Sequence, residues 1–179
     1  LAALDALESW GLDVMGFHGD DVYVSRLTSW IEAYGPRNRI KVREIGDLKR
    51  MAPNGLTRLV AVGDEGEIQR LEQELKTTFD STLYVTRSLP HFCEILHPDG
   101  GKDKALAWIC EQMGITQSET LSFGNGYNDV ELVRWSGLGV AIGGAVPQVL
   151  EVADRVAPPL EQDGVAHVLE DLLDRGLIG

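Results

Sequence analysis

The sequence has 179 residues, of which 44% are hydrophobic and 25% charged, and its formal net charge is −12. These values are ordinary for a globular chain and allow one or two domains with a real core. The acidic balance argues against nucleic acid or an anionic membrane as the main partner, because both require basic surface. An anionic small ligand is still permitted, since a bound Mg²⁺ supplies local positive charge.

The cysteine content and the hydropathy predict a compartment. Cys93 and Cys110 are too few for a disulfide framework, which favours a reducing, cytoplasmic setting. No run of apolar residues is long enough to span a membrane. We therefore expect a cytoplasmic protein whose partners include neither a membrane nor a nucleic acid.

The first 95 residues predict an α+β unit with paired, antiparallel strands. Residues 37–54 are ambiguous and carry a basic cluster, and Asp64 with Glu67 resembles a capping box that opens the following helix. Apolar spacing and turn residues predict a helix over 1–10 stopped at Gly11, a hairpin of strands 12–17 and 22–25, a helix over 26–34 closed by Gly35-Pro36, a helix-like piece ending at Pro53-Asn54-Gly55, a strand over 57–62, a helix after Asp64, and strands over 82–87 and 91–97.

After Pro98 the pattern changes to alternating helices and strands, which predicts a parallel sheet with right-handed crossovers. The expected elements are a helix over 102–113 ended by Gly114, a strand over 120–123, a helix to 135, a strand over 139–142, a helix over 147–153, a short strand at 156–157 and a helix over 163–175. In the first of these helices, the residues expected to face inward are Ala105, Leu106, Ile109, Cys110 and Met113.

This parallel part is too small to stand alone, because it has two good strands and one short one, whereas parallel sheets need more strands and helices on both faces. The chain also begins at Leu1, without methionine, in what reads as the middle of a helix. We therefore expect a fragment of a longer protein, whose missing core strands come from an N-terminal segment in cis or from another chain in trans.

The stretch 119–129 reads as a buried strand that stops at a glycine-bracketed turn before a helix. Gly124 and Gly126 are expected to let the backbone approach a ligand closely and adopt positive φ where needed. The helix N-terminus presents free N–H groups to an anion. Side-chain oxygens in the same small space come from Asn125, Asn128 and Asp129. This combination, at the carboxyl end of a strand, suits a phosphate bound together with a hard cation.

Five sequence blocks carry a family resemblance: Gly100-Gly101-Lys102-Asp103-Lys104-Ala105-Leu106, Phe123-Gly124-Asn125-Gly126-Tyr127-Asn128-Asp129, Gly139-Val140-Ala141-Ile142-Gly143-Gly144-Ala145, Ala153-Asp154 and Asp163-Gly164-Val165-Ala166. In this order and spacing they resemble the Cof-type branch of the haloacid dehalogenase-like (HAD) phosphatases, over residues 91 to 175. The resemblance implies an α/β fold, with residues 96–179 as the C-terminal part of a Rossmann-like HAD core and residues 1–95 as a large α+β cap domain.

The resemblance also implies a reaction. HAD phosphatases hydrolyse phosphomonoesters, often sugar phosphates, through an Asp-x-Asp nucleophile that forms an aspartyl-phosphate, while Mg²⁺ and a lysine neutralise the phosphoryl charge. By resemblance Lys102 is that catalytic, phosphate-binding lysine. Asn128 is a phosphate-binding residue, and Asn125 and Asp129 occupy the metal-binding positions.

The sequence departs from the family pattern in two places. It contains no Asp-x-Asp followed by threonine and no phosphate-binding serine or threonine block, both of which should precede the cap, so the nucleophile is expected outside this chain. Asn125 stands where the family has a metal-binding aspartate, which removes one negative charge and should lower the affinity for Mg²⁺. The alternative is a catalytically silent HAD-like protein that binds a phosphate ligand or a partner.

Other side chains favour ordinary roles. His91, Cys93 and His97 share strand parity, but a strand spreads them too far for one tetrahedral ion. Trp30, Trp108 and Trp135 at helical positions indicate packing. His18 in the hairpin is read as a solvated turn residue, with substrate contact as the alternative. The basic cluster of Arg37, Arg39, Lys41 and Arg43 either meets an anionic substrate or balances acidic neighbours, and the second reading is favoured.

Overall fold

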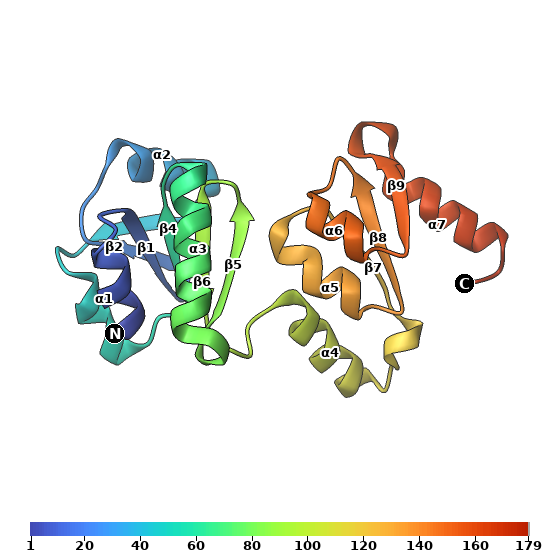
Figure 1. Ribbon diagram of the computed structural model, residues 1–179, viewed down its shortest axis with the longest axis horizontal. Coiled ribbons are helices and arrows are strands. Elements are labelled where there is room, and N and C mark those ends of the chain that lie inside the picture. The colour runs from blue at the N-terminus through green and yellow to red at the C-terminus, as the bar shows by residue number, and fades with distance from the viewer. Residues whose placement is uncertain (179) are drawn as a thin grey trace. The chain divides into compact units, whose positions relative to one another are not determined.

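The computed structural model describes residues 1–178 and divides into two compact units, with the boundary between Asp99 and Gly100 (Figure 1). The predicted boundary between residues 95 and 96 would cut strand β6 (Phe92–Leu96) before its last residue. That the first unit is a cap and the second part of a core remains a prediction. None of the described helices has the length and apolarity needed to cross a membrane.

The first unit is built on a six-stranded sheet in the order β3-β2-β1-β4-β6-β5, in which only β2 and β3 are parallel neighbours. The predicted hairpins β1–β2 and β5–β6 are both present. The elements are α1 (Ala2–Glu8), β1 (Asp13–His18), β2 (Asp21–Val24), α2 (Ser29–Asn38), β3 (Lys41–Glu44), the 3₁₀ turn η1 (Leu48–Asn54), β4 (Arg58–Val62), α3 (Glu65–Phe79), η2 (Asp80–Thr82), β5 (Tyr84–Leu89) and β6.

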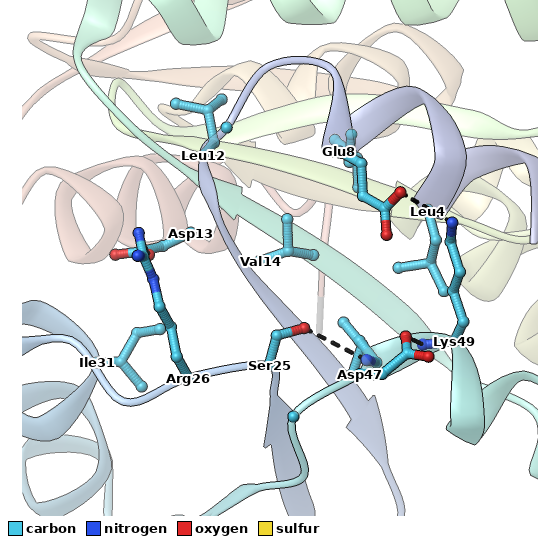
Figure 2. Close-up of a pocket in the computed structure, with 14 residues that line it drawn as sticks. Leu4, Glu8, Leu12, Asp13, Val14, Ser25, Arg26, Ile31, Asp47 and Lys49 are labelled. Atoms are coloured by element: carbon cyan, nitrogen blue, oxygen red, sulfur yellow. Dashed lines mark hydrogen bonds and ion pairs between the residues drawn. The ribbon is translucent and has the colours of Figure 1, made fainter.

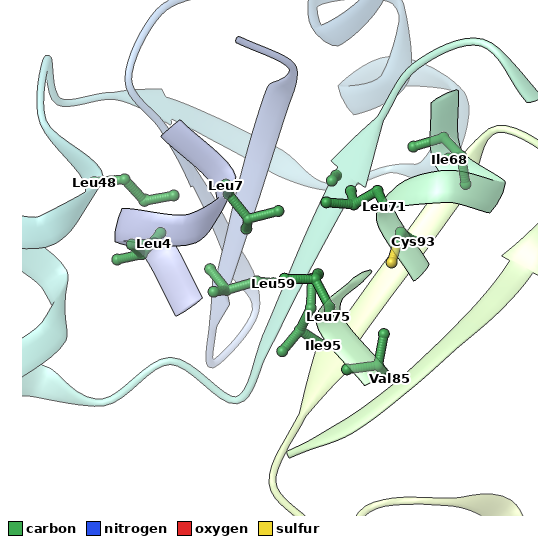
Figure 3. Packing of buried hydrophobic residues seen from close by; sticks show 11 residues of the cluster. Leu4, Leu7, Leu48, Leu59, Ile68, Leu71, Leu75, Val85, Cys93 and Ile95 are labelled. Carbon is green, nitrogen blue, oxygen red and sulfur yellow. The ribbon is translucent and has the colours of Figure 1, made fainter. Parts of the chain in front are cut away.

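Helices cover both faces of this sheet, and the alternation of side chains along β4 supplies both cores. On one face α1 and α3 pack against β4, β5 and β6 (Figure 3). On the other face α2 packs against β1, β2 and β4. Leu59 and Ala61 point to the first core, whereas Val60 and Val62 point to the second. The strand predicted over 57–62 is therefore present as β4.

An ion pair is buried beneath α3. The Arg87 Nε donates to Glu72 Oε2 at 2.7 Å, and the two side chains are 7% and 10% exposed. Glu72 also accepts from Lys76 one turn along α3, at 2.8 Å. The free thiol of Cys93 is buried in the core on the same side of the sheet, and burial raises its pKa to about 12.

The end of α2 differs from the prediction. The expected stop at Gly35-Pro36 is wrong, because the helix continues to Asn38 and is capped by Arg39 in the left-handed conformation. Gly35 is required for packing rather than for termination. A Cβ at this position would lie 3.1 Å from both the Ile40 carbonyl oxygen and Val42 Cγ2, where β3 begins beside the helix.

The capping box expected at Asp64 and Glu67 does not form: Asp64 is the N-cap of α3, but its side chain makes no capping hydrogen bond. A complete box occurs instead at Thr116 and Glu119, around the short 3₁₀ turn η3 (Gln117–Glu119). There Glu119 Oε2 accepts from the Thr116 backbone N–H at 2.8 Å. An acidic residue three positions after a candidate N-cap, as at Glu67, was therefore not enough to predict which groups accept hydrogen bonds from the free backbone N–H groups at the start of a helix.

The second unit contains a three-stranded parallel sheet in the order β7-β8-β9, which confirms the predicted α/β alternation. Its elements are α4 (Lys102–Met113), η3, β7 (Leu121–Gly124), η4 (Tyr127–Asp129), α5 (Val130–Trp135), β8 (Leu138–Gly143), α6 (Pro147–Val152), β9 (Arg155–Pro159), η5 (Leu160–Gln162) and α7 (Gly164–Asp174). Helices α5 and α6 cover one face and α7 covers the other.

Helix α4 buries less than its sequence predicted. Of the residues expected to face inward, Cys110 is buried, but Ala105 is exposed, and Ile109 and Met113 are 45% and 67% exposed. Trp108 on the same helix is 63% exposed, so the packing role predicted for it is also wrong. The apolar periodicity is real, but within the described residues much of this helix surface has no covering layer.

We expect Gly139→Ala to lower the free energy of unfolding by about 3 kcal/mol. A Cβ there would lie 2.0 Å from the Val133 carbonyl oxygen, and backbone cannot yield as a side chain does. Gly66→Ala is the matched control, because a Cβ at that position in α3 meets nothing within 4 Å, and it should stabilise by ~0.5–1 kcal/mol. Urea denaturation of both variants checks this, and similar values for the two would contradict it.

Candidate active site

The glycine turn lies at the carboxyl end of β7, where the sequence places it. Strand β7 ends at Gly124, Asn125 and Gly126 form the turn, and η4 leads directly into α5. The Asn125 carbonyl oxygen accepts a hydrogen bond from Val146 N at 3.0 Å, which ties the turn to the start of α6. Val146 is a contact that the motif gave no reason to expect.

Asp129 organises the turn from inside. Its side chain is 8% exposed, and its Oδ2 accepts from the backbone N–H groups of Asn125 and Gly126, each at 2.9 Å. The other oxygen, Oδ1, accepts from Lys102 Nζ. One buried carboxylate therefore holds both the turn and the lysine that begins α4.

These contacts decide the charge of Asp129. Burial raises the pKa of this carboxyl, but the hydrogen bonds from Lys102 and from the backbone of Gly126 and Asn125 together outweigh burial. The pKa of Asp129 therefore lies below its ordinary value, and the side chain is ionised at neutral pH.

The positive φ expected where needed at Gly124 and Gly126 does not occur. Neither adopts a positive φ, and Gly126 has φ −103°. At Gly124 a Cβ would lie 2.6 Å from Asp129 Cβ and 2.7 Å from Val133 Cγ2. The absent side chain at Gly124 thus admits Asp129 beneath the turn, so this glycine serves close packing.

Lys102 retains capacity for an anion. It is the first residue of α4, and its side chain is 51% exposed. An ammonium group has three N–H donors, and Asp129 occupies one of them. The lysine can therefore donate to a phosphate oxygen without leaving Asp129.

The other two predicted residues border the same turn. Asn125 is exposed, and Asn128 is partly exposed in η4. The structure thus brings Lys102, Asn125, Asn128 and Asp129 together at one end of β7, with Asn125 and Asp129 linked directly through the backbone hydrogen bond.

The fit of this site to a hard cation can be tested on its oxygens. Two carboxylate oxygens have about four acceptor positions, and three at Asp129 are occupied by Lys102 and the two backbone N–H groups. Within residues 1–178 no group of three or more His, Cys, Asp or Glu side chains is arranged to hold a metal ion. Asn125 and Asp129 are thus of the oxygen type that Mg²⁺ prefers, but supply only part of the octahedral set it requires.

The side chains expected to have ordinary roles differ in outcome, since Trp108 is exposed rather than packed. His18 Nδ1 forms a 2.7 Å hydrogen bond with the Gly55 carbonyl, so this ring packs on a loop rather than standing free in solvent. Trp30 stacks on Tyr34, with 5.6 Å between ring centroids. In the described chain, the histidines and cysteine of the β6 region are not part of a group of three or more His, Cys, Asp or Glu arranged to hold a metal ion.

Comparison with known proteins gives the family. The family model for haloacid dehalogenase-like hydrolases matches residues 2–169. The chain belongs to this family. The resemblance inferred from the sequence blocks is therefore confirmed.

Two comparisons illustrate the relationship. The chain is 30% identical over 133 residues to a protein named HMP-PP phosphatase from Cronobacter sakazakii, covering 73% of this chain and 49% of that enzyme. Among solved structures, a haloacid dehalogenase-like hydrolase from Bacteroides thetaiotaomicron is 26% identical with a TM-score of 0.74, covering 96% of this chain and 65% of that one.

The HAD subclass IIB sugar phosphatase BT4131 shares the fold, with a TM-score of 0.79 at 22% identity, covering 99% of this chain and 65% of that one. The predicted α/β fold is thus confirmed. The chain spans about half the length of the curated phosphatase described above, and less than two thirds of either solved structure.

Proposed function

We propose that this chain is part of a cytoplasmic, Mg²⁺-dependent HAD phosphatase that hydrolyses a phosphomonoester, with sugar phosphates as the favoured substrate class. The observation that carries the proposal is the half-exposed Lys102 held on the buried Asp129 at the carboxyl end of β7. The names of similar proteins, HMP-PP phosphatase and a sugar phosphatase of the same fold, support the reaction class.

Each residue has a role in this proposal. Lys102 donates to a phosphoryl oxygen and offsets the negative charge that grows during transfer, as preorganised donors do in other enzymes. Asp129 positions Lys102 and the turn. Asn128 donates to the phosphate, and Asn125 and Asp129 would hold Mg²⁺. When bound, Mg²⁺ supplies further positive charge at the phosphoryl oxygens.

The nucleophile is assigned to an Asp-x-Asp segment outside this chain, supplied in cis or by a partner, where it forms the aspartyl-phosphate. Two features support a missing core segment. Within the described residues β7 pairs only with β8, so its other edge has no strand. Helix α4 exposes Trp108, Ile109 and Met113, an apolar surface suited to further packing.

The direct test uses the protein that contains both this chain and the Asp-x-Asp segment. Phosphate release is measured across a panel of sugar phosphates and other phosphomonoesters, with Mg²⁺ and with a chelator. We expect Mg²⁺-dependent turnover of at least one substrate. No turnover of any phosphomonoester with Mg²⁺ would overturn the phosphatase proposal.

A second candidate is a catalytically silent HAD-like protein that binds a phosphorylated ligand or a partner. Asn125 favours it, because an amide oxygen binds Mg²⁺ more weakly than a carboxylate. Asn125→Asp in the complete protein separates the two. An increase in rate at limiting Mg²⁺ identifies an impaired enzyme, whereas turnover that stays absent at every Mg²⁺ concentration supports the silent protein.

A further inference from the structure

The first unit contains a cavity that the phosphatase proposal does not use. Its volume is about 490 Å³, which lies in the range of about 300–1,000 Å³ typical of small-molecule sites. It is formed by α1, the start of β1, the end of β2, the first turns of α2 and the segment that leads into η1. All of these elements belong to the first unit, so the cavity is complete within it.

Part of the cavity wall is apolar. Figure 2 shows Leu4, Leu12, Val14 and Ile31 around the same space, contributed by α1, the start of β1 and α2. Leu4 and Ile31 are also core residues of the two opposite faces of the sheet. This wall is therefore anchored in both cores and suits an aliphatic side chain of a ligand.

One side of the cavity carries an incomplete ion pair. Arg26 Nη2 lies 3.8 Å from Asp13 Oδ1, which is longer than a hydrogen bond, and the Arg26 side chain is 74% exposed (Figure 2). No other acceptor is paired with Arg26 in the part of the chain that the structure describes. Its planar guanidinium is therefore available to bind a carboxylate through two parallel hydrogen bonds.

Asp13 is held in place and still has free acceptor positions. Its Oδ2 accepts from the Thr28 hydroxyl at 2.7 Å, and Thr28 is the N-cap of α2. Among the described residues, the other oxygen is paired only with the distant Arg26. A fixed carboxylate with one oxygen free is suited to an ammonium group.

On the opposite side of the cavity, the cation Lys49 is already paired with carboxylates of this chain. Lys49 Nζ contacts Asp5 at 2.6 Å and Glu8 at 2.9 Å, so two of its three donors are engaged (Figure 2 shows the contact with Glu8). These two carboxylates raise the pKa of Lys49, with the hydrogen bond that Lys49 donates to Asp5 as the largest cause. Arg26 and Asp13 are therefore a loosely paired cation and anion beside an apolar wall of the cavity.

We propose that this cavity binds a free α-amino acid with an aliphatic side chain, such as leucine. The ligand carboxylate pairs with Arg26, its ammonium group pairs with Asp13, and its side chain packs on Leu4, Leu12, Val14 and Ile31. A zwitterion matches the opposite charges of the loose pair, whereas a simple anion would be repelled by Asp13. All residues of this site belong to the first unit, whereas the residues proposed to bind phosphate belong to the second.

The test titrates this chain with three probes and follows backbone amide signals by NMR. L-Leucine has both charges, N-acetyl-L-leucine lacks the ammonium charge, and L-leucinamide lacks the carboxylate. We expect L-leucine to shift the signals of Arg26 and Leu48, and each modified probe to bind about tenfold more weakly or worse, as the loss of one charge-assisted hydrogen bond predicts.

Two variants locate the carboxylate contact. Arg26→Gln should weaken the binding of L-leucine by about tenfold and leave the binding of L-leucinamide unchanged, because the amide makes no ion pair with Arg26. The control Arg50→Gln removes an exposed arginine that does not line the cavity and should change neither. Absence of L-leucine binding, equal binding of the three probes, or equal weakening by both variants would overturn the proposal.

Discussion

Under the phosphatase proposal, Lys102→Met is expected to lower kcat of the complete protein by about 10²–10³, the typical cost of removing one donor that stabilises transition-state charge. The structure gives two reasons for a large effect. The lysine has donors left for a phosphoryl oxygen, and it also neutralises Asp129, whose side chain is 8% exposed. Its loss therefore removes the positive charge that would face the substrate phosphoryl group, and it leaves the buried Asp129 carboxylate without its cation.

The measurement is phosphate release at saturating Mg²⁺, with Lys104→Met as the matched control. Lys104 lies two residues along the same helix, about 200° around its axis, so it projects away from Lys102. Equal loss in both variants would indicate damage to α4 rather than loss of a phosphate contact.

A second readout of Lys102→Met needs no turnover. Burial raises the pKa of Asp129 and the Lys102 contact lowers it, so in the variant the pKa of Asp129 should rise. A carboxyl group whose pKa is lower in the folded than in the unfolded state stabilises the fold at pH values above its unfolded-state pKa, and this stabilisation is lost as the pH falls. The variant lacks part of this stabilisation, so it should unfold at a higher pH in an acid titration. An unchanged pKa, followed by carboxyl carbon NMR, would contradict the predicted contact.

Arg87→Met is expected to lower the free energy of unfolding by ~3–5 kcal/mol, because it leaves the buried Glu72 carboxylate without its main partner. The two side chains are 7% and 10% exposed, so water cannot replace the lost hydrogen bond. Lys76 still contacts Glu72 but is 52% exposed and compensates only in part. The effect is measured as the change in the free energy of unfolding, taken from the urea-induced unfolding transition of the first unit.

The double variant Glu72→Leu/Arg87→Met tests the cause. With both charges gone no carboxylate is left buried and unpaired, so the double variant should be more stable than Arg87→Met alone. Arg43→Met is the matched control, because Arg43 forms an ion pair with Asp21 that is 43% and 26% exposed, and its loss should cost less than about 1 kcal/mol. A double variant as unstable as the single one would mean that packing, not charge, dominates.

The proposed function and the amino-acid site assign different roles to the two units. The residues proposed to bind phosphate lie in the second unit, while the cavity with Arg26 and Asp13 lies in the first. Failure of the L-leucine experiment would leave the phosphatase proposal intact, and absence of phosphatase activity would leave the cavity as a ligand site. The two proposals can therefore be judged separately.

The sequence predicted the type and order of most elements because their signals are local. Apolar spacing and the Gly114 stop gave α4 its observed bounds, and turn residues gave the hairpin β1–β2. The error at Gly35 has a tertiary cause: the glycine is needed where β3 approaches α2, and a helix tolerates it for that contact. The strand order β3-β2-β1-β4-β6-β5 also lay outside local pattern, because it depends on pairings between distant residues.

The sequence by itself determined the family, the α/β class and the four residues proposed for the site, Lys102, Asn125, Asn128 and Asp129. These were accessible because they depend on residue types and on their spacing along the chain. Only the tertiary structure decided how they act together. It showed that the Asp129 carboxylate accepts hydrogen bonds from Lys102 and from the turn, and that the absent side chain of Gly124 leaves room for that carboxylate. It also showed the cavity beside Arg26 and Asp13. The physical reason is that hydrogen-bond partners, burial and cavities are set by residues far apart in sequence, which no local pattern encodes.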